Sequence, residues 1–214
     1  MAIPFNKDTR FLFIGDAPTE AGRPTDPEEM GWGYVRFVRD FLRARHPAIA
    51  PIVVNRGANG LRLVDWLERW PREALAQRSD VVSIHFDVPA PSGPPGAPAS
   101  KVVEYLTLYR QILEQTSERL PNCKLVLCQP AAVWTASSFE AADALRPYVH
   151  GVMELAREFN AASIVPMHEA LVYARRSRPD IGWIESDGQF TSSAHMVIAY
   201  TWLEEHGMVP RAVS

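Results

Sequence analysis

The sequence predicts an α/β fold, a three-layer α/β/α sandwich built on a five-stranded parallel sheet. Two patterns favour it. Five short runs are almost continuously apolar and rich in β-branched or aromatic residues, as expected of strands that are buried on both faces of a parallel sheet. Longer segments between these runs repeat their apolar residues with the period of a helix. Strand–helix alternation of this kind favours right-handed crossovers between parallel strands.

Each predicted element follows from its own residues. We expect the 214 residues to form one domain, 1–214, around a single core. Ser193 is the predicted N-cap of the last helix, because a hydroxyl there can accept a hydrogen bond from the first helical turn. The predicted strands are Arg10–Ile14, Pro51–Val54, Asp80–Phe86, Lys124–Cys128 and Ala162–Val165. The helical faces are marked by Tyr34, Val38, Phe41 and Leu42; Val102, Leu106, Tyr109 and Leu113; Leu145, Val149 and Val152; and Met196, Tyr200 and Leu203.

Composition excludes several classes of partner. A net charge of −3 and a pI near 6.1 give no basic footprint for nucleic acid or an anionic membrane. No apolar run approaches the roughly 18 residues of a membrane span. The N-terminal segment lacks the apolar core of a signal peptide, so we expect a cytoplasmic protein. Cys123 and Cys128 fit no zinc or redox spacing, and we expect reduced thiols.

A proline-rich segment follows the third predicted strand. Pro89–Pro98 holds five prolines and two glycines, and proline lacks the amide donor that an inner strand or a helix interior needs. Ligands of open α/β sheets bind at the carboxyl ends of the strands. The segment is therefore interpreted either as a stiff surface loop or as a rim over that edge.

Several segments resemble the sequence blocks of the SGNH/GDSL hydrolases, a family of esterases and lipases. Phe11–Glu20 (FLFIGDAPTE) with Gly31–Val35 (GWGYV) resembles the first block, Val54–Gly60 (VNRGANG) the second, and Asp187–His195 (DGQFTSSAH) the last. The third block would stand where VSIHFDVPAP follows the third strand. The resemblance covers nearly the whole chain and implies an SGNH-hydrolase or flavodoxin-like sandwich.

The resemblance also implies roles for individual positions. In the family, a serine attacks the ester, a histidine takes its proton and an aspartate orients the histidine. Backbone amides and an asparagine stabilise the oxyanion. Gly15 and Asp16 match the first block, but Ala17 stands at the serine position. Asp187 matches the acid of the last block, and Phe190 stands at the histidine position.

The two middle blocks concern the oxyanion. Gly60 matches the glycine of the second block, and an ungapped alignment puts Asp87 at the glycine and Pro89 at the asparagine of the third. Removing one member of a catalytic triad already lowers the rate by about 10⁴- to 10⁶-fold. We therefore predict a protein without a serine-hydrolase triad.

Two functional hypotheses remain open. The first is a pseudoesterase that binds a small, partly apolar ligand, since an apolar pocket with few polar anchors suits such a molecule. The second is an enzyme of lyase, isomerase, cyclase or hydratase type. Its candidate acids and bases are Asp16, Asp87, Asp187 and His85, which follow or end strands and whose pKa values crowding would shift. The expected lining of the ligand pocket is Ala17, Trp32, Tyr34, Asn59, Gly60, Pro89, Trp134 and Phe190.

No cofactor and no metal site are predicted, although crowded carboxylates are also the ligands of divalent cations. A pair between Cys128 and His85 is a further nucleophile hypothesis, yet a cysteine on a core strand is usually a small buried apolar residue. The expected partner is a small-molecule ligand. A homo-oligomer, or pairing with an active paralogue, stays open.

Overall fold

A five-stranded parallel sheet forms the centre of the protein in a computed structural model that describes residues 3–88, 99–131 and 139–210. The strand order is β2-β1-β3-β4-β5, the doubly wound order in which the chain turns outward in both directions from β1 and β3. All four strand pairs are parallel. The strands are β1 Arg10–Gly15, β2 Ile52–Asn55, β3 Val81–His85, β4 Lys124–Cys128 and β5 Ser163–Val165.

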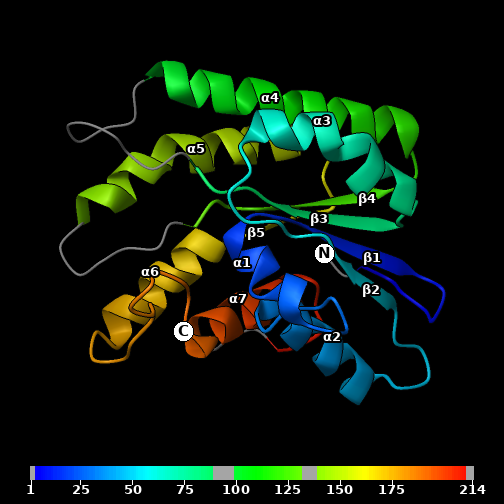
Figure 1. The fold of residues 1–214 in the computed structure, drawn as a ribbon, viewed down its shortest axis with the longest axis horizontal. Coiled ribbons are helices and arrows are strands. Elements are labelled where there is room, and N and C mark those ends of the chain that lie inside the picture. The colour runs from blue at the N-terminus through cyan, green and yellow to red at the C-terminus, as the bar shows by residue number, and fades with distance from the viewer. Residues whose placement is uncertain (1–2, 89–98, 132–138, 211–214) are drawn as a thin grey trace.

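Helices cover both faces of this sheet. They are α1 Ala17–Glu20, α2 Tyr34–Arg45, α3 Leu63–Glu73, α4 Ala99–Arg119, α5 Phe139–Glu158, α6 Met167–Ser177 and α7 Ser192–Glu205, with 3-10 turns at η1 Arg23–Thr25 and η2 Leu75–Gln77. One layer contains α3, α4 and α5, and the other contains α2, α6 and α7 (Figure 1). The predicted three-layer α/β/α sandwich is confirmed.

The two faces of the sheet pack against different aromatic side chains. On the α2–α7 side, Trp202 contacts Phe11 and Phe13 of β1 with ring centroids 5.9 and 5.1 Å apart. On the α3–α4 side, Phe86 contacts Trp66, with centroids 5.8 Å apart, and Tyr109, with centroids 5.0 Å apart. Buried aromatic residues contribute large apolar areas, so both helical layers are fixed firmly on the strands that lead to the carboxyl edge.

The five predicted strands are confirmed, with ends that move by at most one residue. The prediction that Ser193 caps the last helix is wrong. Thr191 is the N-cap of α7: its backbone is extended and its Oγ1 accepts a hydrogen bond from the amide of Ala194 at 3.4 Å. Helices α1, α3 and α6 were not predicted, and α3 contains a proline, Pro71, in its interior.

Other expectations concern the surroundings of the protein. Within the ranges that the structure describes, none of the helices has the length and hydropathy needed to cross a membrane. Cys123 and Cys128 are free thiols. Burial raises the pKa of each thiol to about 12, so both are neutral at physiological pH and poor nucleophiles.

Candidate functional site

The carboxyl ends of β1 and β3 meet closely. Gly15 lies opposite His85 in the strand register, and a Cβ atom on Gly15 would lie only 2.0 Å from the carbonyl oxygen of His85. The next amide, that of Asp16, donates to the same carbonyl at 3.2 Å. Glycine is therefore required at the end of β1, and it sends Asp16 and Ala17 to the carboxyl edge of the sheet.

The first cavity at this edge, called the Ala17 cavity below, has a volume of about 400 Å³. It brings together Ala17, at the start of α1, and Phe190, which precedes α7. Phe190 is only 8% exposed, and its ring stands edge-on to that of His195 at 5.8 Å. The cavity is lined by Ala17, Glu20, Ala21, Gly22, Trp32, Asn59, Gln189, Phe190, Ser192 and His195.

His195 is a lining residue that the sequence interpretation did not select. Its Nδ1 accepts a hydrogen bond from the backbone amide of Tyr34 at 3.3 Å, so the neutral ring carries its proton on Nε2. Burial lowers the pKa of His195 to about 4. The side chain is thus a neutral member of the cavity wall at pH 7. The capped first turn of α7, which begins next to Thr191, is the signal that could have placed it there.

The aromatic residues expected in the pocket separate in the structure. Trp32 lines the Ala17 cavity and is 57% exposed. The expectation for Tyr34 is wrong, because the first turn of α2 directs this side chain into the core. There it is fully buried, and its hydroxyl is 3.1 Å from Oγ1 of Thr19. Trp134 and Pro89 lie outside the described residues.

A second cavity, called the Asp87 cavity below, adjoins the first and has a volume of about 650 Å³. Asn59 lines both cavities, whereas Gly60 lines only the second. The walls of the Asp87 cavity come from the start of α3, from α4 and from the residues that follow β1 and β3. The lining residues are Asp16, Asn59, Gly60, Leu61, Arg62, Leu63, Val64, Asp87, Val88, Lys101, Glu104, Tyr105 and Leu108.

Asp16 is a buried carboxyl group with donors on both oxygens. Its Oδ1 accepts from the indole Nε1 of Trp66 at 2.6 Å, and its Oδ2 accepts from the backbone amide of Asp87 at 2.7 Å. Burial nevertheless raises the pKa of Asp16 to about 7, and the two hydrogen bonds only partly oppose this effect. Asp16 therefore ties β1 to α3 and β3 while it titrates near neutrality.

Asp87 is the second carboxyl group of the pair. Loss of hydration, followed by repulsion from Asp16, raises the pKa of Asp87 well above its usual value. Nε2 of His85 lies 3.9 Å from Oδ1 of Asp87. Burial lowers the pKa of His85 to about 4, and neither ring nitrogen has a hydrogen-bond partner among the described residues. His85 is therefore a neutral neighbour of Asp87.

Two other expected groupings do not form. Asp187 was expected to converge with Asp16 and Asp87, but it lines neither cavity. It is exposed in the turn before α7, where its Oδ1 accepts from the amide of Gln189 at 3.0 Å. Cys128 and His85 lie on the same face of the sheet, but no hydrogen bond joins them: the sulfur of Cys128 lies 3.5 Å from Oγ of Ser83, and neither ring nitrogen of His85 has a hydrogen-bond partner among the described residues. Within the described ranges, no group of three or more acidic, histidine or cysteine side chains is placed to hold a metal ion.

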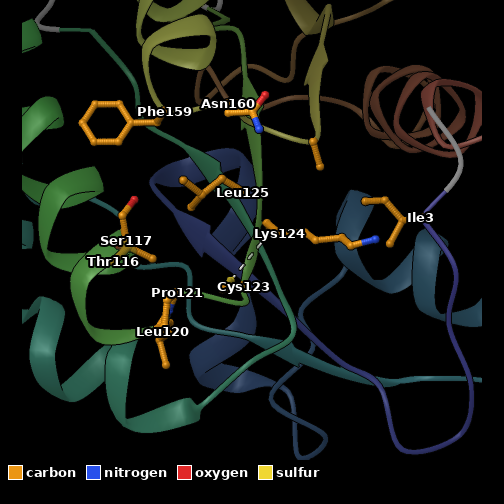
Figure 2. Close-up of a pocket in the computed structure, with 11 residues that line it drawn as sticks. Ile3, Thr116, Ser117, Leu120, Pro121, Cys123, Lys124, Leu125, Phe159 and Asn160 are labelled. Carbon is orange, nitrogen blue, oxygen red and sulfur yellow. Dashed lines mark hydrogen bonds between the residues drawn. The ribbon is translucent and has the colours of Figure 1, made fainter.

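A third cavity lies at the opposite edge of the sheet, beside the amino ends of β4 and β5 (Figure 2). Its walls combine the end of α4, the start of β4 and the loop before β5, with Ile3 from the N-terminal segment. Cys123 lines it and directs its sulfur toward the carbonyl oxygen of Lys124 at 3.7 Å. Burial keeps this thiol neutral, so Cys123 is a poor nucleophile in this cavity.

Comparisons with known proteins agree with this fold. The sequence model of the GDSL-like Lipase/Acylhydrolase family matches residues 13–188. An acetylxylan esterase of Geobacillus stearothermophilus is 39% identical over 84 residues, which are 37% of this chain and only 38% of that protein. A protein assigned as a GDSL-like lipase from Parabacteroides merdae superposes with a TM-score of 0.81 at 28% identity, covering 98% of this chain and 100% of that one.

The acetylxylan esterase Axe2 of Geobacillus stearothermophilus has the same fold. It superposes with a TM-score of 0.77 at 23% identity and covers 96% of this chain and 97% of its own. Because the family match extends over most of the sequence, from β1 to the turn before α7, the chain belongs to the GDSL-like lipase/acylhydrolase family.

Proposed function

We propose that this protein binds a small, partly apolar ester-type ligand in the Ala17 cavity and does not hydrolyse it through a serine triad. The observation that carries the proposal is that Ala17 and Phe190 line the same cavity. A methyl group cannot attack a carbonyl, and a phenyl ring cannot accept a proton. The family's chemistry needs a hydroxyl and an imidazole at these two positions.

The remaining polar groups of the cavity support binding rather than acyl transfer. His195 is the imidazole that lines the Ala17 cavity, but its Nδ1 already accepts the amide of Tyr34. Its neutral ring can offer only the Nε2 proton to a ligand, which suits a hydrogen-bond donor and not a general base. A pocket of about 400 Å³ with apolar walls and a few polar groups is in the range used for small ligands.

The family to which the chain belongs supports an ester-type ligand. The family comprises lipases and acylhydrolases, and this chain resembles an acetylxylan esterase of Geobacillus stearothermophilus. An acyl group that once reacted over β1 can still rest against Ala17 and Phe190, since both are apolar. Loss of reactive groups removes catalysis more completely than it removes binding, because catalysis depends on interactions made in the transition state.

Two measurements test this proposal. Purified protein is expected to turn over short-chain p-nitrophenyl esters no faster than a buffer blank, and to resist labelling by a fluorophosphonate probe. Saturation-transfer NMR with ethyl butyrate should detect binding that Ala17→Leu abolishes by filling the cavity. Ala48→Leu, on an exposed alanine, is the matched control. Labelling at any serine, or equal binding by Ala17→Leu, would overturn the proposal.

A second candidate function is acid–base chemistry in the Asp87 cavity. The observation that favours it is the approach of two carboxyl groups whose pKa values are both raised, a common arrangement at acid–base sites. Both oxygens of Asp16 already accept hydrogen bonds. Asp87 also lines the cavity and is therefore the group that would exchange a proton with a substrate.

This candidate is tested by proton exchange. In D₂O, ¹H NMR of a panel of short hydroxy esters would show solvent deuterium entering the substrate, and Asp87→Asn should abolish that exchange. Asp187→Asn, on an exposed carboxylate outside both cavities, is the matched control. Exchange that persists in Asp87→Asn, or that is absent from the native protein, would reject the acid–base function.

A further inference from the structure

The Asp87 cavity ends on two carboxyl groups that have no cation beside them. Asp16 and Asp87 both line this cavity. Hydrogen bonds from the indole of Trp66 and from the amide of Asp87 occupy the oxygens of Asp16. Neither carboxyl group forms an ion pair with a lysine or arginine of the described residues. A buried anion without a counterion is unfavourable, so a cation that entered this end of the cavity would be stabilised.

His85 adds a polar ring behind the pair but no charge. Its side chain is fully buried, and its Nε2 lies 3.9 Å from Oδ1 of Asp87. Neither ring nitrogen has a hydrogen-bond partner among the described residues. Burial lowers the pKa of His85 to about 4, so the neutral ring cannot balance a carboxylate at pH 7. Buried polar atoms normally have partners, and an unpaired nitrogen that faces Asp87 therefore indicates that a ligand supplies a polar group here.

The remainder of the cavity is mostly apolar. Its walls come from the start of α3 and from α4, which lie side by side in one helical layer (Figure 1). The hydroxyl of Tyr105 donates to the carbonyl oxygen of Phe86 at 3.1 Å, which fixes the ring in the wall. A cavity of about 650 Å³ with such walls can bury a hydrocarbon chain. The apolar lining consists of Leu61, Leu63, Val64, Val88, Tyr105 and Leu108.

The other charged residues of the cavity compensate one another. Arg62 donates two hydrogen bonds to the carboxylate of Asp65, from Nε at 3.1 Å and from Nη2 at 3.0 Å. Its side chain is 79% exposed, so this charge lies toward solvent. Lys101 and Glu104 carry opposite charges three residues apart on α4. The uncompensated charge of the cavity therefore comes from the two aspartates.

We propose that the Asp87 cavity binds a primary alkylamine in its ammonium form, with the cation beside Asp87 and the hydrocarbon chain against α3 and α4. An ammonium group has three N–H donors, which suit the carboxylate of Asp87 and the unpaired Nε2 of His85. Hydrogen bonds between charged groups are stronger than neutral ones. This site is independent of the proposed ester-type ligand, which occupies the Ala17 cavity, and it requires no proton exchange with a substrate.

Isothermal titration with hexylamine at pH 8 tests the amine site. Native protein is expected to bind hexylamine roughly tenfold or more tightly than hexanol or hexanoate, because neither of these carries the cation. Asp87→Asn keeps the shape of the side chain and removes its charge, so it should weaken hexylamine binding by a similar factor. Asp187→Asn, on an exposed carboxylate outside both cavities, is the matched control and should bind normally.

Proton release gives a second readout of the same site. Burial raises the pKa of Asp16 to about 7, and burial together with repulsion from Asp16 raises the pKa of Asp87 well above its usual value. A bound ammonium favours the ionised carboxylates, so binding at pH 7 should release a proton and affinity should rise from pH 6 to pH 8. Burial keeps His85, Tyr34 and Tyr105 neutral across this interval, because it lowers the pKa of the histidine and raises the pKa of each tyrosine. Titrations in two buffers with different heats of ionisation measure the released proton.

The outcomes separate the amine site from both candidate functions. Hexanol that binds as tightly as hexylamine, or hexylamine binding that Asp87→Asn leaves unchanged, would reject the site. Thermal denaturation shows whether Asp87→Asn is folded, and if it is not, the three hexyl ligands compared on native protein decide the question alone. Deuterium exchange without hexylamine binding would reject the amine site and leave the acid–base function standing. Ester turnover by native protein that also binds hexylamine through Asp87 would reject the absence of hydrolysis and leave the amine site standing.

Discussion

The Ala17 and Asp87 cavities lie side by side and share Asn59, yet their walls carry different chemical groups. Consecutive residues at the end of β1 separate them, because Asp16 lines one and Ala17 lines the other. The Ala17 cavity has aromatic, amide and small apolar walls. The Asp87 cavity contains two carboxyl groups with raised pKa values.

This contrast shows that the absence of a hydroxyl and an imidazole from the Ala17 cavity does not determine which ionisable groups the Asp87 cavity contains. Asp16 keeps its place for a reason that does not involve a triad: it holds Trp66 and the amide of Asp87. A buried carboxylate with those donors costs stability if it is removed, so it persists whether or not the protein is an enzyme. Variants in each cavity can therefore test the properties of that cavity separately.

The largest expected effect is a gain of hydrolysis in the Ala17 cavity. Ala17→Ser alone should leave p-nitrophenyl acetate turnover at the blank, because no base stands beside the new hydroxyl. Adding Phe190→His should raise turnover over the single variant by about 10²-fold, the lower end of what a positioned general base contributes. Initial rates measured with Phe190→His alone as the control separate a rebuilt pair from a reactive imidazole.

A single-site rescue by Ala17→Ser would mean that a base is already present, and His195 would then be the residue to replace. An inactive double variant that retains the native fold would show that Ala17 and Phe190 do not face each other closely enough for proton transfer. Either result would remove the observation on which the proposed function rests.

The Asp87 cavity should make stability depend on pH through Asp16. Its pKa rises on folding from 3.8 to about 7, so the folded protein binds more protons than the unfolded chain between these values. The contribution of Asp16 to stability is full below pH 3.8 and decreases as the pH rises toward 7. Asp16→Asn lacks this titration, so its stability relative to native protein should improve with pH across that interval. Urea unfolding at pH 4.5 and 7.5 measures this change.

Asp187→Asn provides the control for that experiment. This carboxylate is exposed and outside both cavities, and its replacement should shift stability equally at both pH values. The buried histidines contribute the same pH dependence to every variant and cancel in the comparison. A constant difference between Asp16→Asn and native protein would show that Asp16 titrates as an ordinary surface carboxyl does.

A smaller effect is expected from the two tryptophan donors of α3. Trp66 donates to the carboxyl of Asp16 at 2.6 Å, whereas Trp70 donates to the hydroxyl of Thr116 at 2.8 Å. Hydrogen bonds to charged groups contribute about 1.5–3 kcal/mol and neutral ones about 0.5–1.5 kcal/mol. Trp66→Phe should therefore destabilise more than Trp70→Phe at pH 8, measured by urea unfolding, and the gap should narrow at pH 5. Equal losses at pH 8 would indicate a neutral Asp16.

Sequence patterns predicted the sheet well because strand burial is a local property. The run RFLFI at residues 10–14 is apolar at nearly every position, and only a strand covered on both faces has that requirement. The same logic placed Asp16 and Asp87 together, since each follows the end of one of two neighbouring strands. It failed for Asp187, which follows no strand and is carried away from the edge by its turn.

Side-chain direction in the loops could not be predicted in this way. Trp32 and Tyr34 are two residues apart, yet the first is open and the second is fully buried. The difference arises because α2 begins at Tyr34 and packs against α7, a tertiary contact with no local signature. His195 was missed for the same reason, since the rotation of α7 on its neighbours decides which of its residues reaches the cavity.

The smallest expected effect concerns the wall that carries Phe190 and His195. Thr191 lies between them and caps α7, accepting the amide of Ala194 at 3.4 Å. Thr191→Ala should cost about 1 kcal/mol of stability, typical of a lost N-cap, and Ser193→Ala, an exposed change inside the helix, should cost less than about 0.5 kcal/mol. Because the cap sets where α7 begins, Thr191→Ala should also weaken ethyl butyrate binding in the Ala17 cavity while leaving the titration of Asp16 unchanged. A shift of the Asp16 titration would show that the two cavities are coupled through Asn59, and they could then not be treated as independent sites.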